Sequence, residues 1–94
     1  MTDKLLNSTI NLVKDELLNG LYKHGEFNSS HELYAVMKEE LDKFWDSVKA
    51  DQTNPDISKL ISLAAVAIEG SMELCQKRAV YLKRVEHDNR SKVQ

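Results

Sequence analysis

Apolar residues recur every three or four positions along most of the chain, which is the spacing of one face of an α-helix. Two short segments interrupt the pattern, one around Gly25 and one around Pro55, the only proline of the 94 residues. Three helical segments are therefore expected, at about residues 3–23, 30–49 and 55–85. The prediction is an all-α fold with a single helical domain, residues 1–86, and a frayed tail, residues 87–94, that lacks the periodicity.

Local signals mark the first interruption. Lys23 and His24 place cations near the end of the first helix, and Gly25 can take the left-handed conformation that closes a helix. Ser29 or Ser30 can then cap the exposed amides of the second helix. Glu32 follows in the first turn, where a carboxylate favours the positive end of the helix dipole. We expect a turn at residues 25–29.

The third helix is the longest and the most apolar. Asn54 as the cap and Pro55 at the first helical position predict its start. Two neighbouring stripes cover it. The first holds Ile57, Ile61, Ala64, Ile68, Met72, Cys75, Ala79 and Leu82, and the second holds Leu60, Leu63, Ala67, Leu74, Tyr81 and Val85. Because three helices cannot cover so wide an apolar arc, we expect a helical bundle completed by oligomerisation through the third helix.

The first two helices each carry one apolar stripe, and the stripe of the second is expected to form the core. The stripe of the first is Leu6, Ile10, Val13, Leu17 and Leu21, and that of the second is Leu33, Met37, Leu41, Phe44 and Val48, flanked by Tyr34 and Trp45. Glu40 lies at the margin of the second stripe, beside a polar strip that contains Glu39 and Lys43. A carboxylate at such a margin can lean into a cleft as a metal or phosphate-site residue, or it can be a solvated surface acid.

Charge and cysteine content exclude several classes of protein. A formal net charge of -2 argues against electrostatic binding to nucleic acid or to an anionic membrane. Cys75 is the only cysteine and no signal segment opens the chain, so a cytoplasmic location is expected. No apolar run approaches the ~20 residues that cross a bilayer.

Four parts of the sequence carry a resemblance to a known family. They are residues 23–32, KHGEFNSSHE, then Tyr34-Ala35-Val36, then residues 39–46, EELDKFWD, and finally residues 60–68, LISLAAVAI. Their order, after a first helix, resembles that of the short MazG-like proteins common in phages and prophages, over roughly Leu17 to Ile68. The resemblance implies an all-α, oligomeric protein of three helices with a long third helix. It also implies a magnesium-dependent activity that splits nucleoside triphosphates into monophosphate and pyrophosphate.

The family's metal motif is only partly present. It consists of two adjacent glutamates, a third acid three residues later, and a glutamate and an aspartate three apart on the next helix, where they share one face. Glu39 and Glu40 match the first pair, but the other positions fall on Lys43, Lys59 and Ser62. The resemblance implies four ligand positions, the second glutamate of the pair and the three later acids. Only Glu40 among these four is acidic, so we expect binding rather than hydrolysis.

The two lysines suggest a substitute for the lost metal charge. If Lys43 and Lys59 face each other across the groove between the second and third helices, their ammonium groups can hold phosphate directly. They would not generate a hydroxide nucleophile as a metal does. In the alternative interpretation, both are exposed side chains that pair with Glu39, Glu40 or Asp56.

Three acidic side chains close by in the sequence are candidates to replace the missing ligands. They are Asp42, Asp46 and Asp56. Asp42 and Asp46 are rotated well away from Glu40 on the helix. A metal site that used them would need a rearranged or intersubunit geometry.

Two other residues are candidates for contact with a ligand. His31 precedes Glu32, but Ala35 stands where a zinc motif would have its second histidine, so His31 belongs to the helix start or contacts a ligand in the cleft. Trp45 can stack on a base, or it can belong to the core or an interface.

Three functions remain open at this stage. The first is binding or sequestration of a nucleotide or nucleotide-derived signal by a homo-oligomer, with Lys43, Lys59, Glu40, His31 and Trp45 as binding residues. The second is the family's pyrophosphohydrolase, with magnesium as the cofactor and Glu40 and Glu39 as its ligands. The third is a protein-interaction module, such as a viral inhibitor of a host protein.

Overall fold

The computed structural model describes the backbone of residues 2–93, and their side chains outside 21–24, 80–82 and 85–93. It contains three helices, α1 (Asp3–His24), α2 (Ser30–Ala50) and α3 (Ile57–Val93), and no strand within the described residues. The predicted all-α class with three helices is confirmed. None of the helices, over the part that is described, has a stretch long and apolar enough for a membrane crossing.

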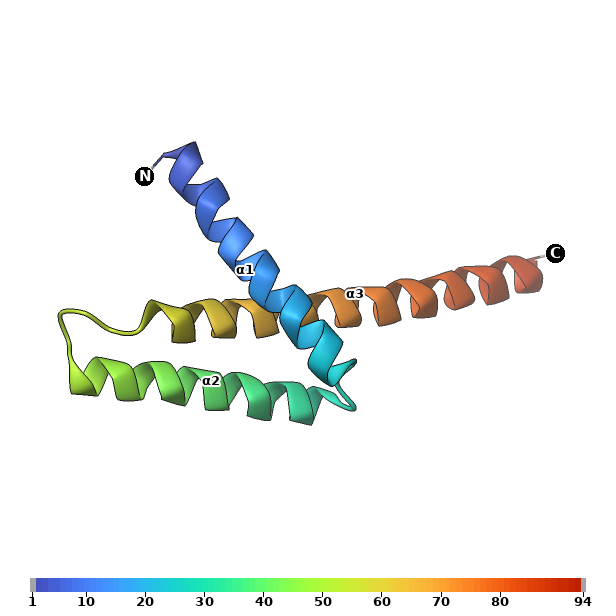
Figure 1. Cartoon of the computed structure of the whole chain (residues 1–94). Coiled ribbons are helices and arrows are strands. Elements are labelled where there is room, and N and C mark those ends of the chain that lie inside the picture. Colours follow the sequence, from blue (N-terminus) through green and yellow to red (C-terminus); the bar gives the residue numbers. More distant parts are fainter. Residues whose placement is uncertain (1, 94) are drawn as a thin grey trace.

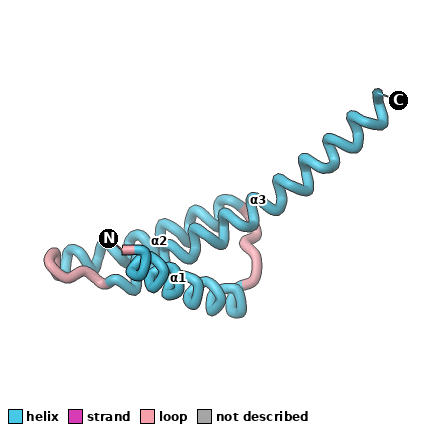
Figure 2. Tube along the Cα trace, turned by 90° about the horizontal axis from the view of Figure 1, so that it is seen from above, coloured by secondary structure: helices cyan, strands magenta, loops and turns pink. Residues whose placement is uncertain are grey.

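The long helix α3 packs against both of the other helices. It runs beside α2 and is crossed by α1, whereas the described residues of α1 and α2 do not pack against each other (Figure 1). The C-terminal half of α3 extends well beyond both (Figure 2). The radius of gyration is 18.1 Å, compared with about 12 Å for a compact domain of this length. The single chain is therefore open and elongated.

The turn between α1 and α2 is built as the sequence predicts. Gly25 has a φ of 67°, which is the left-handed conformation expected of the closing glycine. Ser29 is the N-cap of α2, and its hydroxyl accepts a hydrogen bond from the Glu32 amide at 3.1 Å. The Glu32 carboxylate in turn accepts from the Asn28 amide and side chain, at 3.4 and 2.8 Å. Ser29, rather than Ser30, is thus the cap.

The start of α3 differs from the prediction. The helix begins at Ile57 rather than at Pro55, and Asp56 makes the hydrogen bonds typical of an N-cap residue. Its carboxylate accepts hydrogen bonds from the amide and hydroxyl of Ser58, at 2.9 and 2.7 Å. These bonds, together with the weaker effect of the nearby Lys59 charge, hold the pKa of Asp56 below its ordinary value. The Asp56 amide also donates to the Ser47 hydroxyl at 3.1 Å, which ties the start of α3 to the end of α2.

The end of α3 also differs. The helix continues to Val93, through the segment 87–93 that was expected to fray. After Gly70 the sequence has no glycine or proline, so no residue of the strong helix-breaking types interrupts it. Residue 94 lies outside the described part of the chain.

The buried core of the protomer is small. Among the described side chains, the buried hydrophobic residues are Val13 of α1 and Ala65 of α3, at 9% and 4% exposure. The predicted stripe of α2 is only half-buried at Leu33 and Phe44, and Leu41 is exposed. The expectation that this whole stripe forms a core is therefore wrong for the protomer, because α2 has a single neighbour and presents one side to it.

Much of the apolar surface is uncovered. The protomer exposes 7,897 Å², whereas a compact folded chain of 10.8 kDa exposes about 5,500 Å². On α3, Ile57, Ile68 and Met72 of the first predicted stripe are exposed, and so is Cys75. The predicted apolar positions Leu21, Tyr81, Leu82 and Val85 lie outside the described side chains.

Candidate functional site

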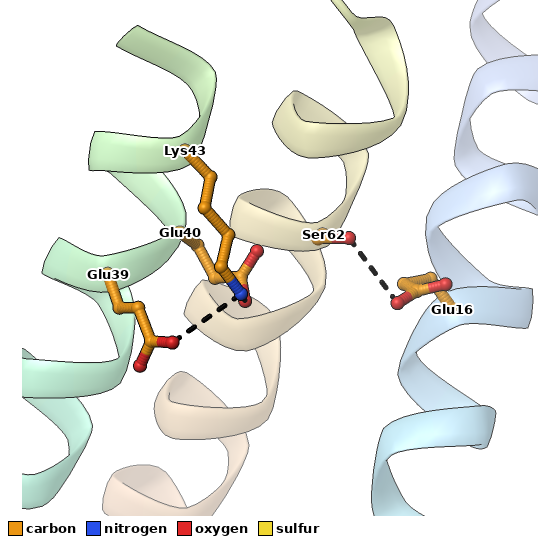
Figure 3. Close-up of polar contacts among 5 residues, drawn as sticks. All are labelled: Glu16, Glu39, Glu40, Lys43 and Ser62. Atoms are coloured by element: carbon orange, nitrogen blue, oxygen red, sulfur yellow. Dashed lines mark hydrogen bonds and ion pairs between the residues drawn. The ribbon is translucent and has the colours of Figure 1, made fainter. Parts of the chain in front are cut away.

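The paired glutamates of α2 and the lysine one turn later form a small ion network. The Lys43 ammonium lies 3.3 Å from Glu40 and 3.5 Å from Glu39 (Figure 3). The hydrogen bond and charge of Glu40, with the charge of Glu39 added, raise the pKa of Lys43 above its ordinary value. The Glu40 side chain is only 18% exposed, whereas that of Glu39 is 67% exposed. This is the geometry of the interpretation in which Lys43 pairs with its neighbouring acids.

Lys59 and Ser62 lie on α3, at the positions where the family resemblance implies acids. Lys59 is half-buried in the first turn of the helix and lies close enough to Asp56 to influence that carboxylate. The Ser62 hydroxyl donates to the Glu16 carboxylate of α1 at 3.4 Å (Figure 3). Ser62 thus links α3 to α1, a connection that the sequence motif did not predict.

A cavity of about 200 Å³ lies where the three helices meet. Its acidic lining residues come from every part of the crossing: Glu16 from α1, Glu26 from the turn, Glu32 and Glu40 from α2, and Glu69 from α3. Apolar side chains complete the wall, among them Leu17, Val36, Ala65 and Val66. No lysine or arginine of the described part of the chain is among the lining residues. We call this the acidic cavity.

The turn that precedes α2 is fixed to α3 at the edge of the cavity. The Phe27 amide donates to both carboxylate oxygens of Glu73, at 3.2 and 3.4 Å. Both residues are half-buried, so this hydrogen bond is partly shielded from water. Glu26, the residue before Phe27, and Glu32, five residues after it, both line the cavity.

Glu69 is the most buried of the acidic residues, at 5% exposure. Sequence reasoning did not single it out, nor Glu16. The sequence does set Glu69 and Glu73 apart on α3, because they are the only charged residues between Leu60 and Leu74. Glu69 also lies one and two turns after Ala65 and Ser62, on one face of the helix. The acids of the cavity become a set only when α1 crosses α3.

The remaining predicted site residues do not join this cavity. His31 is exposed in the first turn of α2 and lies nine residues before Glu40, about 180° away around the helix. Trp45 is 55% exposed, and the Lys49 ammonium lies 5.9 Å from its ring. Glu40 alone of the predicted binding residues lines the cavity, and Lys43 touches the site through its ion pair with Glu40.

A magnesium ion does not fit the described residues of one protomer. Within them, no three or more His, Cys, Asp or Glu side chains are grouped so that they could hold a metal ion. The carboxylates of the acidic cavity belong to three helices and a turn, and Glu40 is already paired with Lys43. The cavity is therefore an acidic and partly apolar recess rather than a preformed cation cage.

Comparison of the chain with protein-family models, with curated proteins and with solved structures finds no match.

Proposed function

We propose that the chain is a MazG-like helical protein that binds a nucleotide or a nucleotide-derived molecule without hydrolysing it, as a homo-oligomer. The observation that carries this proposal is the position of two lysines relative to the acidic cavity. Lys43 comes three residues after Glu40, and Lys59 comes three residues before Ser62. Residues three apart lie on one helix face, and Glu40 and Ser62 both line the cavity. Each lysine is thus one turn beyond a cavity wall.

The cavity suits the base rather than the phosphates. Carboxylates accept hydrogen bonds, so the glutamates of the cavity can accept hydrogen bonds from the amino groups of a nucleobase. Val36, Ala65 and Val66 offer apolar cover to the ring. At about 200 Å³ the cavity is smaller than the ~300–1,000 Å³ of pockets for drug-sized ligands. It can therefore hold part of a nucleotide, with the rest outside.

The phosphates would lie one turn away, against Lys43 and Lys59. A lysine ammonium is a compact cation that donates to phosphate oxygens. Lys43 must exchange its carboxylate partners for the phosphate. The Lys43 and Glu39 side chains are 45% and 67% exposed, so this ion pair is weak enough to exchange, whereas the pair with Glu40, which is 18% exposed, is more shielded from water. Binding by lysines alone predicts no requirement for a divalent ion.

Absence of hydrolysis follows from the same residues. An ammonium group neutralises phosphate charge, but it does not lower the pKa of a bound water as a divalent metal does. Within the described residues of a protomer, no acidic cluster is placed to supply such a metal. The function that this supports is sequestration of a nucleotide or a nucleotide-derived signal.

One observation favours a second candidate function. Tyr34, Leu41 and Trp45 lie on one side of α2 and are exposed by 68%, 50% and 55%. Such a stripe is typical of a surface that docks another protein. In that case the chain acts as a protein-interaction module and the acidic cavity has no ligand.

A thermal-shift panel separates these functions. Nucleotides and cyclic dinucleotides are tested with magnesium and again with a chelator, and pyrophosphate release is measured in parallel. Because a ligand of the native state raises the Tm, the proposal predicts a shift that survives the chelator, without pyrophosphate. The double variant Lys43→Ala/Lys59→Ala should lose most of the shift, whereas the control Lys4→Ala/Lys38→Ala, which removes two exposed lysines elsewhere, should keep it.

Two results would contradict the proposal. Magnesium-dependent release of pyrophosphate would show that the chain is a pyrophosphohydrolase. Failure of every nucleotide to raise the Tm would contradict nucleotide binding. The exposed α2 stripe would then favour the function of a protein-interaction module.

A further inference from the structure

Charge is divided unevenly along the chain. Of its 13 Lys and Arg residues, six lie after Glu73, whereas only two of its 15 acidic residues do. Between Leu74 and Val85 the sequence has four cations and no acid. This segment, which we call the basic arm, belongs to the part of α3 that extends beyond α1 and α2 (Figure 2). Its described side chains, including Arg78, Lys83 and Arg84, are exposed.

A groove of opposite charge lies at the other end of α3. Its walls are α1 and the first turns of α3, and its volume is about 560 Å³. Leu12, Ile57 and Ile61 make it apolar, and Asp15 and Glu16 make it acidic. We call this the α1–α3 groove. Leu12 and Ile57 are 56% and 67% exposed, so the protomer itself does not fill it.

We infer that the basic arm of a second copy of this chain lies in the α1–α3 groove. An amphipathic helix that lays an apolar face in a groove and its charges against the rim is a common mode of recognition. Here the rim is acidic and the arm is basic, so the charges attract and also fix the direction of docking. In a symmetric dimer the contact occurs twice, because each copy offers both surfaces.

The two-fold symmetry of the inferred dimer indicates which part of α3 lies at the centre of the interface. If the arm of one copy lies in the groove of the other, the two α3 helices run antiparallel. Ser58, in the groove, and Arg84, in the arm, are equally far along α3 from Ser71, so the two-fold axis passes near Ser71. Ile68 and Met72 flank that position and are 42% and 54% exposed. The stripe that the protomer leaves open then becomes the centre of the interface.

The single chain exposes more surface than a compact chain of its mass. The protomer exposes 7,897 Å², about 2,400 Å² more than a compact chain of its mass. A standard interface takes about 800 Å² from each partner. The excess is thus large enough for the arm, the groove and the central stripe together.

The inferred contact also bears on the acidic cavity. Glu16 and Ser62 line both the cavity and the α1–α3 groove. A partner arm in the groove would therefore lie next to the α1 side of the cavity. Its side chains would add to the walls of a site that is small in one protomer. This inference rests only on the oligomer of the proposed function and not on the nucleotide, so its test measures association without nucleotide.

The experiment is sedimentation-velocity ultracentrifugation of the full chain with two charge-reversal variants. The arm variant is Arg78→Glu/Arg84→Glu, and the groove variant is Asp15→Lys/Glu16→Lys. The matched controls, Lys4→Glu/Lys38→Glu and Asp42→Lys/Asp46→Lys, reverse equally exposed charges elsewhere. The wild type should sediment as a dimer whose dissociation constant rises with salt. Each reversal variant should weaken the dimer by about tenfold or more, and the controls should leave it unchanged.

Mixing the two variants completes the test. In the mixture, the intact arm of the groove variant meets the intact groove of the arm variant, and the two reversed surfaces are again complementary. The inference predicts that the mixture recovers the dimer, even where either variant alone is monomeric or poorly folded. Dimers that persist in both single variants, or a mixture that does not recover association, would overturn it.

Discussion

Gly70 of α3 lies directly against Leu33 of α2. A Cβ atom built on Gly70 would lie 2.5 Å from Leu33 Cδ2 and 2.6 Å from Leu33 Cδ1. Cβ atoms in proteins essentially never approach another heavy atom this closely without a shift of one of the two. Gly70 is buried, whereas at Gly20 of α1 an added Cβ would meet nothing within 4 Å. A side chain at position 70, where α2 and α3 form two walls of the acidic cavity, would therefore require the Leu33 side chain to move.

Gly70→Ala should therefore destabilise the protein. Overpacking costs about 1–3 kcal/mol, which exceeds the ~1 kcal/mol that alanine contributes to helix propensity. Gly20→Ala, the matched control, should stabilise. In a Leu33→Ala background the clash is absent and Gly70→Ala should no longer destabilise. Chemical denaturation of the four variants checks this, and equal stabilisation by both alanines would contradict the observed packing.

The cap of α2 gives a second prediction. Ser29→Ala removes the hydroxyl that accepts from the Glu32 amide, and should lower the free energy of unfolding by about 1 kcal/mol. Ser30→Ala, one residue later and inside the helix, is the control and should change it by much less. If the two variants lose equal stability, Ser29 is not the cap.

The tie between the turn and α3 gives a third prediction. Glu73→Ala removes the acceptor of the Phe27 amide and should cost about 1 kcal/mol. It should also speed hydrogen exchange at Phe27, because the turn loses its anchor. Glu73→Gln keeps an acceptor oxygen and should preserve most of the protection. Unchanged exchange at Phe27 in Glu73→Ala would show that the turn is held by other contacts.

The cap of α3 makes a prediction about pH. The pKa of Asp56 is lower in the folded protein than its ordinary value of 3.8, so its ionised form favours folding. Its contribution is complete above pH 3.8 and is lost as the pH falls through the folded-state pKa. Asp56→Asn should flatten this part of the stability profile, whereas Asp42→Asn should not. Stability profiles of the variant and wild type that are parallel below pH 4 would contradict the role of Asp56.

The local structure was largely predictable from the sequence. Gly25 and Ser29 act through their own backbone and nearest neighbours, and such signals can be recognised in sequence. The start of α3 was predicted at Pro55 because Asn54 and Pro55 form a typical start signal. Asp56 takes the cap instead, with its amide bonded to the Ser47 hydroxyl, a contact between residues nine apart.

The site was predictable only in part. Glu40 was identified because a margin position on one helix follows from periodicity alone. Glu16 and Glu69 could not be placed beside it, because they meet only where α1 crosses α3. Sequence spacing could not reveal that crossing. The apolar stripe of α3 was likewise recognised from the sequence, and its residues Ile68 and Met72 are exposed in the single chain.

The most direct test of the proposed function is an amide NMR titration with a nucleoside triphosphate in the presence of a chelator. Binding across the cavity and the lysine pair predicts that the amides of Glu40, Val66 and Ser62 shift together with those of Lys43 and Lys59, at one affinity. Shifts that require magnesium, that are confined to the outer side of α2 around Trp45, or that do not occur would contradict the account.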